Sequence, residues 1–430
     1  MTVAIVVLAI ALALVSAGLA FHIYLSALHD RCHEPVLAAE IHTVVTEDGW
    51  TLFLHRRRPA GGGGEPVFLC HGLATNHFNF MLPPHASISD ALVEAGYDCW
   101  IVDLRACRSA VPAPGVNRLK ATVDDLLLRD IPAALGHIAK TTGYDKVHWV
   151  GHSMGGMLLY AYELQFGNAR VASAVTLGAP IGFAGVRHKS HSFLVAIAPY
   201  VHRFMANSFK ALAPLLNKRV YKYRWLPIDW DNTDPRIGTA EIYHAMELPL
   251  PLIGGQMNHW ASTQTWTMCD GALDVQARLH ELQTPLLIVL GRSDPFIPQN
   301  RARAFFDALP NPDKKMLVLS KENGYSADYN HIDLAVSTHN AEEVQRPIVE
   351  WIQAHPIRMQ APEAHSADAR TATPKKRGSA PKKTAAKATA ARSATKVRPA
   401  AKNKAKSQAK PTAKAKTKTK TKARTGRKKS

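Results

Sequence analysis

The sequence predicts an α/β fold: a mostly parallel sheet with helices on both faces and a helical cap insertion. Short apolar runs alternate with segments of helical spacing, which is typical of parallel strands joined by helices. One segment, 181–281, interrupts this alternation and is longer than an ordinary loop. We expect strands in the apolar runs at 66–72, 98–105, 146–153, 171–180, 284–294 and 314–320.

The elements around these strands follow from local patterns. Residues 40–59 alternate between apolar and polar on either side of Asp48-Gly49, which predicts a β-hairpin that turns there. The amphipathic segment 122–143 has acidic residues near its start, which suits a helix N-terminus. Further helical spacing occurs at 87–97, 155–167, 300–310 and 341–355. The segment 181–281 has aromatics, prolines and short amphipathic pieces, so we expect it to form a helical cap over the carboxyl edge of the sheet.

The N-terminal segment is apolar and carries no Lys, Arg, Asp or Glu from Met1 to Leu28. About 20 such residues suffice to cross a bilayer as a helix. No basic residue precedes the apolar core and the core is long, which favours an uncleaved single-pass anchor over a cleaved signal peptide or a buried soluble helix. "GLA" before Phe21 would serve as the cleavage site of a signal peptide. Arg31 and Arg56 to Arg58 follow the span, which favours a body on the cytoplasmic side.

The formal charge of +19 belongs to the C-terminal tail. Residues 370–430 contain 23 lysines and arginines and no acidic residue, which leaves 30 basic and 34 acidic residues in positions 1–369. From Met359 onward the chain is rich in Ala, Lys, Thr and Pro without apolar periodicity, so we expect it to be disordered. It is similar to the Ala-Lys-Pro arms of histone H1-like proteins, and such arms bind nucleic acid or another polyanion through its phosphates.

These limits divide the chain into five parts. They are an anchor or signal peptide at 1–28, a first part of the α/β core at 35–180, the cap at 181–281, a second part of the core at 282–358 and a basic tail at 359–430.

The stretch GHSMGG, residues 151–156, carries the strongest chemical signal. Gly151 and Gly155 stand two residues either side of Ser153, where the absence of side chains lets a helix pass close to a strand. A predicted strand precedes this G-x-S-x-G motif and a predicted helix follows it, which is the context of a nucleophile elbow. The alternative is an ordinary strand–turn–helix in which glycine supplies only flexibility.

A serine hydroxyl becomes a useful nucleophile when a base takes its proton and a third group orients that base. Asp294 ends a predicted strand, and His331 lies in the loop before the closing helix. The chain order Ser153, Asp294, His331 is the order expected with this elbow. Competing residues for the acid and the base are Asp274, Asp328, Asp333 and His339.

The negative oxygen that forms during such an attack needs backbone N–H donors. One donor is expected from Met154, the residue after the nucleophile. The other is expected from Leu73, in the loop after the strand at 66–72, where His71 and Gly72 shape the turn.

We expect no cofactor and no metal ion. The chain has neither a G-x-G-x-x-G fingerprint nor a P-loop, and its five cysteines include no CxxC pair. HDRCHE at 29–34 and HKSH at 188–191 have ligand-like spacing, but a closed structural zinc site requires four ligands.

Several motifs together resemble the α/β-hydrolases. These are VVTEDGWTLFLHRRRP, HGLATNHFNF, AGYDCWIVDLR, GHSMGG and YNHIDL, which occur in that family's order within about residues 40–355. The hairpin and the NHID around His331 are most similar to the acid lipase branch, the relatives of lysosomal and gastric lipases. A looser similarity is to polyhydroxyalkanoate synthases, which carry Cys where this chain has Ser153. The resemblance implies the α/β-hydrolase fold, the triad Ser153, Asp294 and His331, and oxyanion donors at Leu73 and Met154.

The chain departs from that family after VDLR, where a glycine-rich GxGxS segment is usual and this chain has ACRSA (106–110). We expect a serine hydrolase that cleaves carboxylic esters of lipid-like or medium-chain acyl groups through an acyl-enzyme, because the cap is rich in apolar residues. The alternatives are an acyltransferase with the same triad and a membrane-tethered protein that binds polyanions through its tail.

Overall fold

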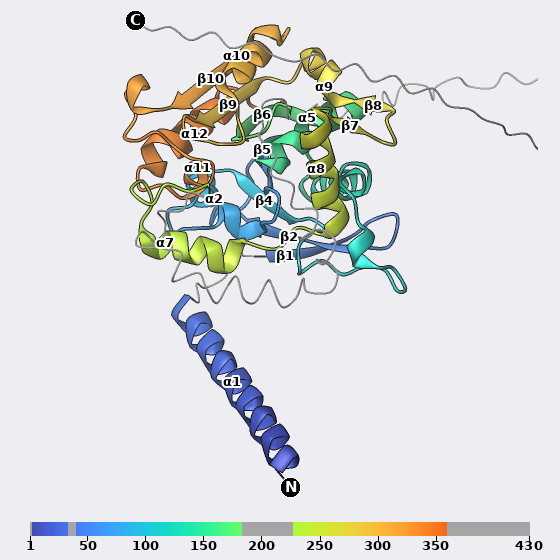
Figure 1. Ribbon diagram of the computed structural model, residues 1–430. Coiled ribbons are helices and arrows are strands. Elements are labelled where there is room, and N and C mark those ends of the chain that lie inside the picture. The colour runs from blue at the N-terminus through green and yellow to red at the C-terminus, as the bar shows by residue number, and fades with distance from the viewer. Residues whose placement is uncertain (1, 33–39, 183–226, 359–430) are drawn as a thin grey trace, which may run out of the picture. The chain divides into compact units, whose positions relative to one another are not determined.

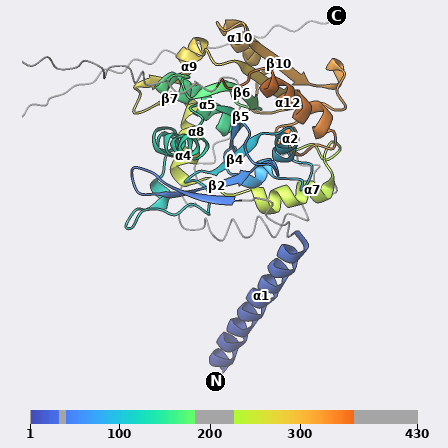
Figure 2. The same cartoon turned by 180° about the vertical axis from the view of Figure 1, so that it is seen from behind.

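The protein is described by a computed structural model over residues 2–32, 40–182 and 227–358. Its body contains one eight-stranded sheet (Figure 1), which Figure 2 shows from behind. The strands are β1 Glu40–Val45, β2 Thr51–Arg57, β3 Pro66–Cys70, β4 Asp98–Asp103, β5 Val147–His152, β6 Val171–Leu177, β9 Leu286–Gly291 and β10 Lys314–Leu319. Their order across the sheet is β1-β2-β4-β3-β5-β6-β9-β10. The β1–β2 and β2–β4 pairs are antiparallel and the other pairs are parallel, as expected of a mostly parallel sheet.

The helices lie between the strands along the chain. The α-helices are α1 Thr2–Cys32, α2 Ile88–Glu94, α3 Val123–Asp125, α4 Ile131–Thr142, α5 Met154–Phe166, α7 Pro235–Ala240, α8 Pro251–Thr263, α9 Val275–Arg278, α10 Gln299–Ala308, α11 Asp333–Val336 and α12 Arg346–Gln353. Short 3₁₀ or π segments are η1 His77–Phe80, η2 Arg118–Lys120, η3 Leu126–Asp130, η5 Glu241–Ala245, η6 Leu279–Glu281, η7 Lys321–Asn323 and η8 Ala341–Gln345.

The sheet has a hydrophobic core on each face because successive strand residues point to opposite sides. In β3, Val67 and Leu69 belong to one core, and Phe68 and Cys70 belong to the other. Residues of α4, α5, α9 and α10 complete the first core, and residues of α2, α11 and α12 complete the second. Strands buried on both faces read as continuous apolar runs, which is why the sequence predicts them well. The predicted fold class is confirmed.

Two expected helices are less regular than predicted. The segment 122–143 contains the π-helical turn η3 between α3 and α4, and the closing helix begins with the π-helical turn η8. The described part of the expected cap, 227–281, contains helices and also a small antiparallel pair, β7 Thr267–Met268 with β8 Leu273–Asp274. This pair lies outside the main sheet.

Helix α1 includes an apolar segment, Ile5–Leu28, of 24 residues with a mean hydropathy of 2.5. It is long and apolar enough to cross a membrane, and a signal sequence has the same properties. The predicted tail at 359–430 and the first part of the predicted cap lie outside the described residues, so the five-part division remains a prediction.

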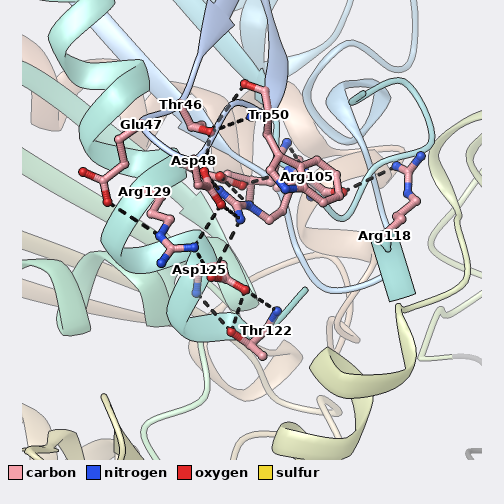
Figure 3. Close-up of polar contacts among 12 residues, drawn as sticks. Thr46, Glu47, Asp48, Trp50, Arg105, Arg118, Thr122, Asp125 and Arg129 are labelled. Carbon is pink, nitrogen blue, oxygen red and sulfur yellow. Dashed lines mark hydrogen bonds and ion pairs between the residues drawn. The ribbon is translucent and has the colours of Figure 1, made fainter. Parts of the chain in front are cut away.

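A buried arginine ties the β1–β2 hairpin to the segment that follows β4 (Figure 3). Arg105 has an exposed fraction of 1%, and its Nη atoms donate to both carboxylate oxygens of Asp48 at 2.8 and 3.0 Å. Its Nε donates to Asp130 at the end of η3 at 2.7 Å, and its guanidinium lies 5.1 Å from the centre of the Trp50 ring. Partial burial acts against ionisation of Asp48, but hydrogen bonds from Arg105 and Thr46 outweigh it and lower the pKa of Asp48.

Candidate active site

The predicted elbow joins β5 to α5 at Ser153. Its φ is 52° and its ψ is −116°, a left-handed conformation that a residue other than glycine adopts at an energetic cost. The backbone N–H of Ser153 donates to the carbonyl of Leu177 on β6 at 2.9 Å, which holds the turn against the neighbouring strand. Strained residues of this kind persist where the surrounding structure fixes them, and they concentrate at functional sites.

The two predicted elbow glycines are required by close backbone contacts. A Cβ on Gly151 would lie 2.6 Å from backbone atoms of Gly155, and a Cβ on Gly155 would lie 1.9 Å from the carbonyl oxygen of Cys70. Any side chain at either position would therefore push α5 away from β3 and β5 and move Ser153.

Asp294 and His331 form a hydrogen-bonded pair although they are far apart in the sequence. His331 Nδ1 lies 2.7 Å from Asp294 Oδ2, and both residues have an exposed fraction of 6%. Asp294 Oδ1 accepts a second hydrogen bond from the backbone N–H of Phe296 at 2.8 Å, which fixes the carboxylate. A carboxylate only accepts hydrogen bonds, so Nδ1 carries the proton and Nε2 is the nitrogen free to act as a base.

The residues that competed with Asp294 and His331 in the sequence have other positions. Asp274 caps α9 by accepting from Ala277 N at 2.9 Å. Asp328 accepts from Lys321 N at 3.0 Å, and His339 is exposed. Among the described residues that line the cavity beside Ser153, none of these three is present.

Asp333, the remaining competitor, holds the loop of His331 in place. Its carboxylate accepts from the backbone N–H of Asn330 at 3.0 Å and from that of Asp229 at 2.8 Å. Burial raises the pKa of Asp333 to about 7, and these backbone hydrogen bonds oppose that rise. Asp333 therefore acts on the position of His331 and connects its loop to the segment at 227–232.

The expected oxyanion donors lie at the same place. Leu73 and Met154 line the cavity together with Ser153. Met154 is the first residue of α5, and the first N–H groups of a helix have no partner within the helix. A Cβ on Gly72 would stand 3.0 Å from Ser153 Cβ, which shows how closely the loop after β3 approaches the elbow.

A cavity of about 530 Å³ opens beside Ser153 and His331. Its wall is mostly apolar, and the 227–281 segment contributes to it through Met246, Pro249 and Met257. Sites for small molecules are typically apolar hollows of about 300–1,000 Å³ with a few polar groups. The cavity therefore has the size and character of a binding site for a mostly apolar molecule.

The ACRSA segment, 106–110, does not contact this cavity directly, since none of its residues is among the described residues in the wall. Cys107 is buried with its Sγ 3.0 Å from Nε2 of His71. The backbone N–H of Arg108 donates to Glu247 at 2.7 Å. This segment therefore contacts the site indirectly, through the turn after β3 and through the 227–281 segment.

Sequence patterns did not predict several polar residues of the cavity, among them Asn79, His152 and Glu241. His152 stands next to Ser153 within the quoted motif, but nothing in the sequence indicated its partners. Glu241 lies in a region without any recognisable motif.

Within the part of the chain that the structure describes, two groups of buried side chains have donor atoms within 4.8 Å of one another: His55, His77 and Asp103, and His71, Asp103 and Cys107. Asp103 lies 3.2 Å from His55 Nε2 and 3.0 Å from His77 Nδ1, so its carboxylate has a hydrogen-bond partner on each histidine of the first group. The side chains of 29–34 and 188–191, the sequences with ligand-like spacing, lie outside the described residues.

Residues 65–324 match the family model of the alpha/beta hydrolase fold, which covers more than half of the chain. An esterase from Thermogutta terrifontis, solved with malate bound, superimposes with a TM-score of 0.50 over 74% of this chain and 100% of its own, at 18% identity. At this identity the likeness concerns the fold alone.

Two lipases share more sequence with the chain. Lipase 1 of Drosophila melanogaster is 29% identical over 189 residues, which make up 40% of this chain and 40% of that lipase. The gastric triacylglycerol lipase of Homo sapiens is 35% identical over 128 residues, which make up 27% of this chain and 32% of that lipase. The match thus spans less than half the length of either lipase.

Proposed function

The chain belongs to the α/β hydrolase fold family, and from this premise we propose that it is a carboxylic ester hydrolase with Ser153 as its nucleophile. The observation that supports this most is geometric. Ser153 stands at a strained elbow in the wall of a cavity, and His331, paired with Asp294 at 2.7 Å, stands in the same wall. The lipase names of the two sequence relatives agree with ester hydrolysis.

In the proposed reaction, the Ser153 oxygen attacks the ester carbonyl while His331 Nε2 takes the hydroxyl proton. Asp294 keeps the imidazole in the required tautomer and stabilises its positive charge. His331 then gives the proton to the leaving alcohol, which departs and leaves an acyl-enzyme. A water molecule, deprotonated by the same nitrogen, releases the acid.

The N–H groups of Leu73 and Met154 are proposed to stabilise the oxyanion of both tetrahedral intermediates. Loss of one such donor typically costs about 10²–10³ in turnover. Backbone donors cannot be removed by changing the side chain, which makes the elbow conformation itself part of the catalytic apparatus.

The proposed substrate is an ester with a medium-chain or lipid-like acyl group. The mostly apolar wall and the volume of about 530 Å³ support this, because burial of CH₂ groups against such a wall is favourable. The curated relatives are named lipases, and one is named for triacylglycerol.

Labelling with a fluorescent fluorophosphonate tests the nucleophile, and hydrolysis of p-nitrophenyl esters of increasing acyl length tests the substrate class. We expect the wild type to be labelled on Ser153 and the Ser153→Ala variant to be neither labelled nor active. Ser262→Ala, on the exposed side of α8, is the matched control. Undiminished turnover by Ser153→Ala would rule out the proposed nucleophile.

We further propose that Ile5–Leu28 remains as a single-pass anchor with the body on the cytoplasmic side. Its length and hydropathy support a span, and Arg31 with Arg56 to Arg58 after the span supports the orientation. Carbonate extraction of membranes, followed by protease digestion of intact and opened vesicles, tests both points. Release into the carbonate supernatant would contradict the anchor.

A further inference from the structure

The cavity beside Ser153 has a polar end built from three buried side chains. Asn79, His152 and Glu241 all line it, with exposed fractions of 1%, 3% and 2%. They come from η1, from the end of β5 and from the start of η5, so the tertiary fold brings them together. We call these three residues the polar subsite.

His152 lies against the oxygen of the Asn79 amide. Burial, reinforced by the neighbouring His331, lowers the pKa of His152 to about 3, so the ring is neutral at physiological pH. Its Nδ1 lies 2.9 Å from Asn79 Oδ1, and its Nε2 lies 3.2 Å from the backbone carbonyl oxygen of His331. The ring nitrogen that carries the proton donates to one of these two oxygens.

This arrangement leaves two polar atoms of the subsite without a partner. One atom of the Asn79 amide is used by His152, and the other has no hydrogen-bond partner within the described residues. Glu241 Oε2 is likewise buried and unpartnered there. Burial raises the pKa of Glu241 to about 8, and the Asn79 amide opposes this only in part, so the carboxyl is mostly protonated near neutral pH.

Unpartnered buried polar groups are costly, and native proteins leave few of them. Here both belong to residues that line the cavity. A protonated carboxyl both donates and accepts, and an amide offers either a donor or an acceptor. The smallest substrate group that satisfies both at once is a hydroxyl, because it too donates and accepts.

We propose that Asn79 and Glu241 bind a hydroxyl group of the ester substrate within a few bonds of the scissile carbonyl. The polar subsite lies close to Ser153, and this closeness limits the distance between the substrate hydroxyl and the scissile carbonyl. Ser153 Cβ and His152 Nδ1 lie 3.0 and 3.3 Å from the point where a Gly72 Cβ would stand, and Asn79 is in contact with that nitrogen. This proposal rests on the proposed ester hydrolysis at Ser153 and names the class of ester that the site selects, a hydroxylated one.

The test compares kcat/KM for matched esters with and without a hydroxyl group. One pair places the hydroxyl on the acyl part, p-nitrophenyl β-hydroxyhexanoate against p-nitrophenyl hexanoate. The other places it on the alcohol part, 2-hydroxyethyl hexanoate against ethyl hexanoate. We expect the wild-type enzyme to prefer the hydroxylated member of one pair by about tenfold or more, which identifies the part that carries the group.

Variants of Glu241 separate hydrogen bonding from packing. Glu241→Met removes the hydrogen-bonding group and keeps the length, so the preference should fall by about tenfold. Glu241→Gln keeps a donor and an acceptor, so the preference should stay within about threefold of the wild-type value. Glu350→Met, the same change on the exposed side of α12, should leave the preference unchanged.

Equal wild-type kcat/KM within both pairs would overturn the proposed subsite, and this comparison needs no variant to fold. A preference that survives Glu241→Met would overturn the role of Glu241. In either case ester hydrolysis by the wild type, and its loss in Ser153→Ala, would leave the proposed function standing. Hydrolysis of the hydroxylated and the unhydroxylated esters by Ser153→Ala would instead refute the proposed function.

Discussion

Two buried aspartates in this protein have partners at the same distance and contribute in different ways. Asp130 Oδ1 lies 2.7 Å from Arg105 Nε, and Asp294 Oδ2 lies 2.7 Å from His331 Nδ1. Arg105 is always charged, so it cannot take a proton from a reacting group. A neutral imidazole has one unprotonated ring nitrogen, so His331 can. The identity of the partner, and not the contact distance, separates a structural ion pair from a pair suited to catalysis.

The surroundings of the two pairs differ as well: protein groups surround Arg105, whereas His331 borders a cavity. Arg105 directs both Nη atoms to Asp48, and Trp50 lies against its guanidinium, so the charge of Arg105 is paired within the protein (Figure 3). Burial raises the pKa of Asp130, and the positive charge of Arg105 opposes that rise. His331, in contrast, lines a cavity.

Asp294→Asn should have the largest effect, and it should fall on activity. The amide keeps an oxygen for Phe296 N–H, but it favours the wrong tautomer of His331 and cannot stabilise the imidazolium. We expect kcat for a p-nitrophenyl ester to fall by about 10³–10⁴. The melting temperature, measured by differential scanning fluorimetry, should change little. A variant with nearly full activity would exclude Asp294 as the orienting acid.

Arg105→Met should have the opposite profile, with the loss in stability. The change leaves Asp130 buried without its cation, and removing one partner of a buried ion pair typically costs about 3–5 kcal/mol. Urea unfolding measures this free energy, and kcat per folded molecule should change far less. Arg346→Met is the control, since Arg346 at the start of α12 pairs with Glu342 of η8 on the surface, where an ion pair contributes less than about 1 kcal/mol. A stable but inactive Arg105→Met protein would show that the arginine cluster belongs to the catalytic site.

The sequence predicts these two regions unequally. The strands and the elbow are local patterns, because buried strands are apolar runs and the motif around Ser153 is contiguous. Asp294 and His331 follow from chain order once the elbow is assigned. The pairing of Arg105 with Asp48 and Asp130 depends on three separate segments, and no spacing in the sequence indicates it.

The polar subsite illustrates the same limit. Glu241 has a raised pKa only because the fold buries it beside Asn79. The sequence alone does not indicate which single position the fold buries. The π-helical turn η3 in the predicted helix 122–143 likewise has no local signal that we can identify. Contacts between distant side chains, rather than element types, account for what was missed.

Glu241 extends the comparison, since it is a buried carboxyl without an ionic partner among the described residues. Burial raises its pKa from 4.5 to about 8, so the folded state holds a proton that the unfolded state releases above about pH 4.5. The contribution of Glu241 to stability therefore falls as the pH rises from about 4.5 to about 8 and then levels off. Glu241→Gln removes this ionisation. The variant's melting temperature, relative to that of the wild type, should rise across this range in matched buffers. A constant difference between the two proteins would contradict a raised pKa.

Two glycine substitutions test whether the proposed reactivity of Ser153 depends on the strained elbow. A methyl group on Gly155 would meet the carbonyl oxygen of Cys70, so Gly155→Ala must displace α5 from the sheet. Overpacking of this kind typically costs about 1–3 kcal/mol, and here it also moves Ser153 and the Met154 N–H. Gly136, in α4, has no atom within 4 Å of an added Cβ, so Gly136→Ala should stabilise the protein by about 0.5–1 kcal/mol and leave kcat unchanged. Urea unfolding and ester hydrolysis on both variants separate the two effects. If Gly155→Ala kept full kcat, the tight contact would serve stability alone, and the elbow would not need its present geometry to position the nucleophile.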